Sequence, residues 1–187
     1  VLADMAAIAI QYGYQTQFCG ALVQGVKNGN VVKAYADIGL KLFNAFGITP
    51  LQDSFQGAES LDPKDYLGWA GMRAWMYQSC TEFGFYQVAN SNVAESSRSA
   101  RISLEYHNQV CNRLFGLTKP VDEDQTNAKY YLQLFKPTTK NILFTNGSND
   151  PWSNLSITPQ NPGPSANAAL NLTVIEGSAH CDDLGER

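Results

Sequence analysis

The chain has 187 residues, of which 44% are hydrophobic and 16% are charged, and its formal net charge at pH 7 is -4. This composition supplies enough apolar side chains for a buried core and excludes an intrinsically disordered chain. The lysines and arginines form no runs and no apolar stretch is long enough to span a bilayer, so neither a nucleic-acid partner nor a membrane segment is expected.

Helices are predicted for the first part of the chain. Residues 2–11 are rich in Ala and Ile, and residues 15–27 continue in the same style until the Asn28-Gly-Asn30 turn. Residues 32–46 place apolar side chains about one turn apart, which predicts an amphipathic helix. The next segment is polar and irregular, with a turn or a helix start expected at Asp62-Pro63.

The second part of the chain has a different pattern. Residues 73–80 are rich in aromatic side chains with partial alternation, which predicts a strand, and residues 97–115 have helical character. Residues 141–145 and 172–175 are short apolar runs that end at turn signals, and both predict buried strands. Two such strands, each followed by a polar loop, favour an α/β fold with functional loops at the strand ends.

An aspartate and a histidine come after the two predicted strands. Asp150 lies in the loop after the first strand and His180 in the loop after the second, about one βαβ crossover apart. In α/β-hydrolases the nucleophile, the acid and the histidine occur in this chain order. An imidazole activates a hydroxyl by removing its proton, and a carboxylate holds that imidazole in the right tautomer. On position alone, an ordinary turn aspartate and a loop histidine are the more frequent explanation.

Metal and cofactor sites are not predicted. The four cysteines stand at positions 19, 80, 111 and 181, without the Cys-x-x-Cys spacing of zinc or redox sites. Of the two histidines, His107 lies in a predicted helix and is expected at the surface. No Gly-x-Ser-x-Gly elbow occurs, and neither Ser148 nor Ser178 has a glycine two positions away on both sides. The sequence therefore contains no candidate for a hydrolase nucleophile.

Four blocks of sequence carry a family resemblance. They are Ala7-Ile-Ala-Ile-Gln-Tyr-Gly13 with Lys27-Asn-Gly29, Arg73-Ala-Trp-Met-Tyr-Gln-Ser-Cys-Thr-Glu82, Asn146-Gly-Ser-Asn-Asp-Pro-Trp152 and Gly177-Ser-Ala-His-Cys-Asp-Asp-Leu184. In content and order they resemble the motifs of the proline-specific serine peptidases of family S28. The blocks span nearly the whole chain. Any one of them is modest evidence for the family, but all four together are specific for it.

The resemblance implies an α/β-hydrolase core interrupted by an inserted helical cap domain. Residues 1–66 would be the C-terminal part of that cap and residues 67–187 the C-terminal part of the core. By motif match, Asp150 is the acid and His180 the general base of a serine triad. Trp152 corresponds to a wall of the pocket for the proline side chain, which suits a flat indole face.

Further substrate contacts are implied less directly. Phe85 lies where some relatives place an apolar pocket residue, although the local sequence departs from theirs. Glu82 belongs to the shared block, and two roles stay open for it: a structural role and a substrate contact.

The resemblance also implies partners. The expected substrate is a peptide with proline at P1, cleaved on the carboxyl side of that proline. The nucleophilic serine would lie upstream or on another chain, so the remainder of the same precursor is the expected partner and this chain alone is expected to be inactive. A homodimer and a secreted, lysosomal or vacuolar location are family expectations. The alternatives are a non-catalytic binding protein with a peptidase-like fold, and an esterase or lipase on the same fold.

The cysteines have one implied pairing. Cys80 and Cys111 correspond to a disulfide bond of the relatives. For the other two, three arrangements stay open: Cys19 with Cys181, Cys19 with a cysteine upstream of this chain, or Cys181 as a buried free thiol beside the histidine.

Three Asn-x-Ser/Thr sequons are present. Asn146 is expected to be unmodified, because a glycan there would crowd the loop of Asp150. Asn154 and Asn171 are the better candidates for glycosylation.

Overall fold

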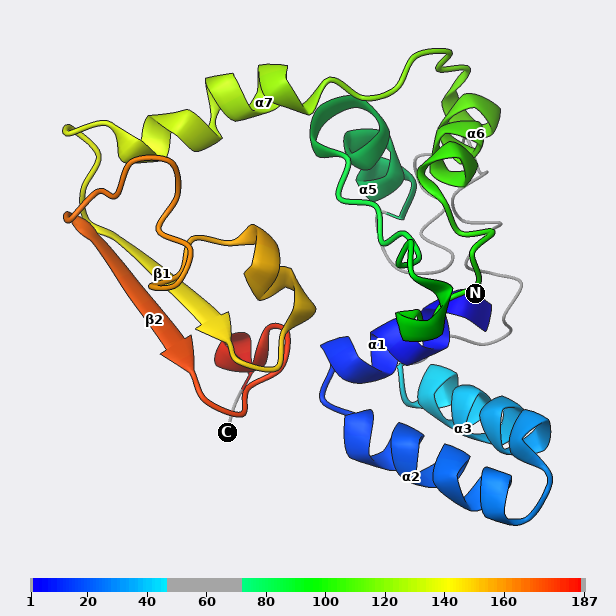
Figure 1. Cartoon of the computed structure of the whole chain (residues 1–187). Helices are drawn as coiled ribbons and strands as arrows, with labels where there is room; N and C mark the ends of the chain where they lie inside the picture. Colours follow the sequence, from blue (N-terminus) through cyan, green and yellow to red (C-terminus); the bar gives the residue numbers. More distant parts are fainter. Residues whose placement is uncertain (1, 47–71, 186–187) are drawn as a thin grey trace. The chain divides into compact units, whose positions relative to one another are not determined.

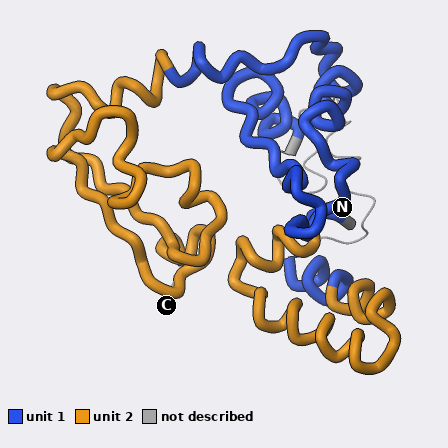
Figure 2. The backbone as a smooth tube through the Cα atoms, in the orientation of Figure 1, with its two compact units in different colours: residues 1–4, 39–127 blue, residues 5–38, 128–187 orange. Residues whose placement is uncertain are grey.

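The computed structural model describes residues 2–46 and 72–185. The chain divides into two compact units, one of residues 1–4 and 39–127 and the other of residues 5–38 and 128–187 (Figure 2). Each unit therefore consists of one segment from the N-terminal part of the chain and one segment from later in the chain. The cap boundary after residue 66 and the Asp62-Pro63 turn lie outside the described residues and stay predictions.

The N-terminal helices agree with the sequence prediction. α1 spans Met5–Gln11, α2 spans Gln15–Lys27 and α3 spans Val31–Ala45 (Figure 1). The turn after α2 needs a residue in the left-handed region, and Gly29 supplies it with φ of 69°. The short 3-10 helices of the described chain are Leu2–Asp4, Val93–Glu95, Tyr131–Phe135, Pro151–Leu155 and Asp182–Leu184.

The strand predicted at residues 73–80 is wrong. This segment forms α5 (Met72–Gln78), which continues into a π-helical turn, Ser79–Phe83. Trp75 and Tyr77, whose β propensity favoured a strand, are exposed, whereas Cys80 is buried. Burial of Cys80 through a tertiary contact prevails here over local propensity.

The helix predicted at residues 97–115 is shorter than expected. α6 spans Leu104–Phe115, because Ser103 has an extended backbone and its hydroxyl accepts a hydrogen bond from the Tyr106 amide at 3.2 Å. α6 ends at Gly116 in the left-handed conformation. A further short helix, α7, spans Glu123–Lys129.

The histidine of α6 differs from its expected surface position. His107 is half-buried and stacks on Tyr86, with ring centroids 4.8 Å apart. Burial lowers the pKa of the His107 imidazole, and the positive charge of Arg98 acts in the same direction. This histidine is therefore a packed residue of the first unit.

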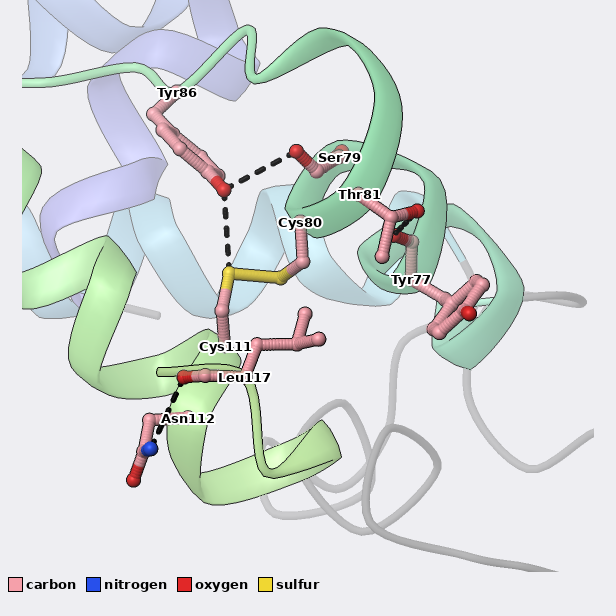
Figure 3. The surroundings of a disulfide bond; sticks show 8 residues. All are labelled: Tyr77, Ser79, Cys80, Thr81, Tyr86, Cys111, Asn112 and Leu117. Carbon is pink, nitrogen blue, oxygen red and sulfur yellow. Dashed lines mark hydrogen bonds between the residues drawn. A yellow bond between two sulfur atoms is a disulfide. The ribbon is translucent and has the colours of Figure 1, made fainter. Parts of the chain in front are cut away.

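One disulfide bond connects the π-helical turn after α5 to α6. Cys80 in the π-helical turn is bonded to Cys111 in α6, as the resemblance implies, and both residues are buried (Figure 3). The Tyr86 hydroxyl donates a hydrogen bond to the Ser79 carbonyl at 3.1 Å and lies 3.2 Å from the Cys111 sulfur. The disulfide bond therefore lies among buried residues of the first unit.

Removing this bond is expected to cost stability. The cysteines are 31 positions apart, and a closed loop of that length corresponds to about 3–4 kcal/mol of unfolding free energy. We expect Cys80→Ser with Cys111→Ser to lose about that amount in urea unfolding of the intact protein. Cys19→Ser is the control, because Cys19 is free and exposed, and it should change little. A double variant as stable as the control would contradict the prediction.

The sheet of the described residues has two parallel strands. β1 (Ile142–Gly147) pairs with β2 (Leu170–Ile175), from Ile142 opposite Leu170 to Gly147 opposite Ile175. Both strands match predicted runs, but they are only partly buried, with Leu143 61% exposed. The connection between them contains a single 3-10 turn, Pro151–Leu155, in place of the full helix of a βαβ crossover. Because the strands are parallel, their carboxyl ends meet at one edge.

Candidate active site

Two loops meet at the carboxyl edge of the strand pair, in the second unit. The Ser148 amide donates a hydrogen bond to the Ile175 carbonyl and the Asn149 amide to the Ser178 carbonyl, each at 3.0 Å. Only glycine permits this approach at the end of β1, because a Cβ on Gly147 would lie 2.3 Å from the Ser178 carbonyl oxygen. Backbone contacts therefore hold the loop of Asp150 against the loop of His180.

Asp150 and His180 are hydrogen-bonded to each other. Nδ1 of His180 lies 2.8 Å from Oδ2 of Asp150, while Oδ1 of Asp150 accepts the Trp152 amide at 2.9 Å. The Asp150 side chain is 10% exposed and that of His180 is 28% exposed. One ring nitrogen is therefore committed to a buried carboxylate, and Nε2 is the nitrogen that can serve a reacting group.

Aromatic rings lie next to this imidazole. The Trp152 ring centroid is 6.0 Å from that of His180 with a tilt of 34°, and both residues line a pocket of about 240 Å³ at the loop edge. Tyr12, after α1, lies 5.9 Å from the imidazole in an edge-to-face arrangement. The sequence prediction missed Tyr12; its place in the first block with a family resemblance was the only signal.

The other predicted site residues lie elsewhere in the chain. Glu82 and Phe85 are exposed residues of the first unit, whereas Asp150, Trp152 and His180 belong to the second. Phe85 has a left-handed backbone with φ of 55°. A substrate contact for either residue stays a prediction.

The two remaining cysteines do not form the disulfide that the sequence left open. Cys19 and Cys181 are both free and exposed, so Cys181 is also not the buried thiol considered above. Partial burial, followed by the charges of Asp150, Asp183 and Asp182, raises the pKa of the Cys181 thiol. A protonated thiol is a weak nucleophile, which argues against Cys181 as an attacking group.

The sequon asparagines differ in exposure. Asn146 is buried and its side-chain amide donates to the Ile157 carbonyl at 3.2 Å, which leaves no room for a glycan. Asn154 and Asn171 are exposed.

Residues 2–46 and 72–185 contain neither a metal-binding cluster nor a membrane-spanning helix. Within these ranges, no group of three or more His, Cys, Asp or Glu side chains is arranged to hold a metal ion. No helix there combines the length and hydrophobicity that crossing a membrane requires.

Comparison with known proteins assigns the family. Residues 8–187 match the family described as Serine carboxypeptidase S28. The probable serine protease EDA2 of Arabidopsis thaliana is 33% identical, and the match covers 82% of this chain and 30% of that protein. The thymus-specific serine protease of Mus musculus is 32% identical, and the match covers 90% of this chain and 33% of that protein. A probable extracellular serine carboxypeptidase of Arthroderma benhamiae is 31% identical over 60% of this chain and 16% of its own. This chain thus spans about a third of the length of the first two relatives, and it belongs to the serine carboxypeptidase S28 family.

Proposed function

We propose that this chain contributes the acid and the general base of a serine peptidase that cleaves on the carboxyl side of proline. The observation that carries the proposal is the 2.8 Å contact between His180 Nδ1 and Asp150 Oδ2 at the carboxyl ends of two parallel strands. The nucleophilic serine would come from the remainder of the same precursor, on an α/β-hydrolase core that this chain completes.

The proposed chemistry uses both ring nitrogens of His180. As the serine Oγ forms its bond to the scissile carbonyl carbon, the hydroxyl proton passes to Nε2. As the carbon–nitrogen bond breaks, the same proton passes to the leaving amine, and water then releases the acyl group by the same route. Asp150 keeps the proton of the neutral ring on Nδ1 and stabilises the imidazolium that forms.

Trp152 supports the proline preference. Its half-buried ring lies beside the imidazole and lines the pocket, so an apolar side chain of the residue before the scissile bond would contact the indole. A pyrrolidine ring has the flat apolar surface that such a wall favours. Glu82 and Phe85 are further candidates for substrate contact on the basis of the family resemblance alone.

The exposed strand residues support a larger core. Parallel strands are normally covered on both faces, yet Leu143 is 61% exposed in β1. Further strands and helices of an α/β-hydrolase core would cover it. Exposure of Asn154 and Asn171 agrees with glycosylation in a secreted or lysosomal protein.

Fluorophosphonate labelling of the intact protein tests the proposal. We expect a serine outside this chain to be labelled and His180→Ala to abolish labelling. His107→Gln is the matched control, since His107 is the other histidine and packs in the first unit. A folded wild type that takes no label would favour the binding-protein alternative. A labelled enzyme that hydrolyses fatty esters but not prolyl peptides would favour the esterase.

A further inference from the structure

We propose that Tyr12 is a positioning residue that holds the His180 imidazole in its reactive orientation. The proposal rests on the proposed function, because it assigns Tyr12 a role in the same reaction. Tyr12 comes from the opposite end of the chain, and neither its residue type nor its spacing from His180 suggests the contact. It belongs to the same compact unit as His180.

The C-terminal end of α1 is attached to the histidine loop by its backbone. The His180 amide donates a hydrogen bond to the Gln11 carbonyl at 2.8 Å. Gly13 lies close to the same loop, since a Cβ there would be 3.5 Å from that of Ala179. The segment around Tyr12 is therefore fixed relative to the backbone of His180.

The His180 side chain is restrained from several directions. Asp150 holds Nδ1, but a single hydrogen bond tolerates some rotation of the ring about the Cβ–Cγ bond of His180. Tyr12 contacts the imidazole at an interplanar angle of 75° and Trp152 at 34°, so the two rings bound it with different orientations. These two ring contacts would restrict rotation of the imidazole and, with it, the direction of Nε2.

The Tyr12 ring, rather than its charge, is suited to this role. Burial raises the pKa of the Tyr12 phenol, a hydrogen bond with Gln11 lowers it, and the nearby Cys181 and Asp150 raise it further. The net shift is upward, so the phenol stays neutral through the pH range in which a histidine works as a base. A phenylalanine, which keeps the ring, should therefore hold the imidazole as Tyr12 does.

Variants of the intact protein test the proposal. Tyr12→Leu keeps an apolar side chain but removes the ring, and we expect kcat and the rate of fluorophosphonate labelling to fall about 10- to 100-fold with little change in KM. Tyr12→Phe should restore both rates. The control is Tyr35→Leu, because Tyr35 makes a similar edge contact in the same unit, with the ring of Phe18 at 5.6 Å. It should lower the melting temperature without lowering the labelling rate of the folded protein.

Two outcomes would overturn the role of Tyr12. One is a Tyr12→Leu variant that folds and labels as fast as wild type, and the other is a Tyr12→Phe variant as slow as Tyr12→Leu. The low-field NMR resonance of the proton between His180 and Asp150 gives an independent readout, which Tyr12→Leu should broaden or shift and Tyr12→Phe should keep. If the wild type takes no label, the proposed function fails, and this resonance alone decides whether Tyr12 holds the imidazole.

Discussion

Asp150→Asn is expected to lower kcat of the intact enzyme by about 10⁴-fold with little loss of stability. The side-chain oxygen of asparagine still accepts the Trp152 amide, which Asp150 Oδ1 accepts at 2.9 Å. Its amide group, however, donates to His180 Nδ1 and leaves the ring proton on Nε2, where the base must be free. The imidazole is then present and well placed but in the wrong tautomer.

Two further substitutions separate catalysis from structure. Asp150→Ala removes the hydrogen bond to Trp152 as well, so it should also cost about 1–2 kcal/mol of unfolding free energy. Asp182→Asn is the matched control: Asp182 accepts the Ala179 amide at 2.7 Å in the same loop, and kcat should stay within about 2-fold. Steady-state kinetics on a prolyl peptide and thermal melts give both quantities. An Asp150→Asn enzyme with near wild-type kcat would refute the assignment of the acid.

Gly147→Ala is expected to have the second large effect. The added Cβ would meet the carbonyl oxygens of Ser178 at 2.3 Å and Ala179 at 2.8 Å, and these are backbone atoms that cannot rotate away. The histidine loop must move by several tenths of an ångström or more. We expect a loss of about 1–3 kcal/mol in unfolding free energy and a fall in kcat/KM of about 100-fold.

The control for this substitution is Gly20→Ala in α2. A Cβ on Gly20 meets nothing within 4 Å, so alanine in that helix should stabilise the protein by about 0.5–1 kcal/mol and leave the rates unchanged. Melting curves and labelling rates distinguish the two variants. A Gly147→Ala enzyme as active as Gly20→Ala would show that the close approach of the two loops is not needed for the reaction.

Local sequence located the two strands and the loops that follow them, although β1 continues to Gly147, two residues beyond the predicted end at 145. The apolar runs before Asp150 and His180 end at turn signals, and a parallel pair brings its carboxyl ends together, so the pair was predictable from chain order. Gly29 and Gly116 likewise end helices where expected, because a left-handed residue favours glycine. In these cases neighbouring residues are sufficient to specify the conformation.

The errors arose where specific contacts, distant in one case and local in the other, override the pattern of side-chain types. Residues 73–80 have β-type composition, yet they form a helix whose continuation is bonded through Cys80 to Cys111. The segment before α6 looked helical, but the Ser103 cap starts the helix later. Side-chain pairing and capping are specific contacts that hydrophobic periodicity does not record.

The sequence by itself determined that an acidic residue and a histidine stand after two strands, in the order and motifs of a serine peptidase family. Only the tertiary structure decided that they are hydrogen-bonded and that Tyr12 contacts the imidazole. The physical reason is the difference in range. Turns and strand ends depend on residues next to one another, whereas the contact of α1 with the histidine loop joins the two ends of the chain and forms only when the whole unit packs.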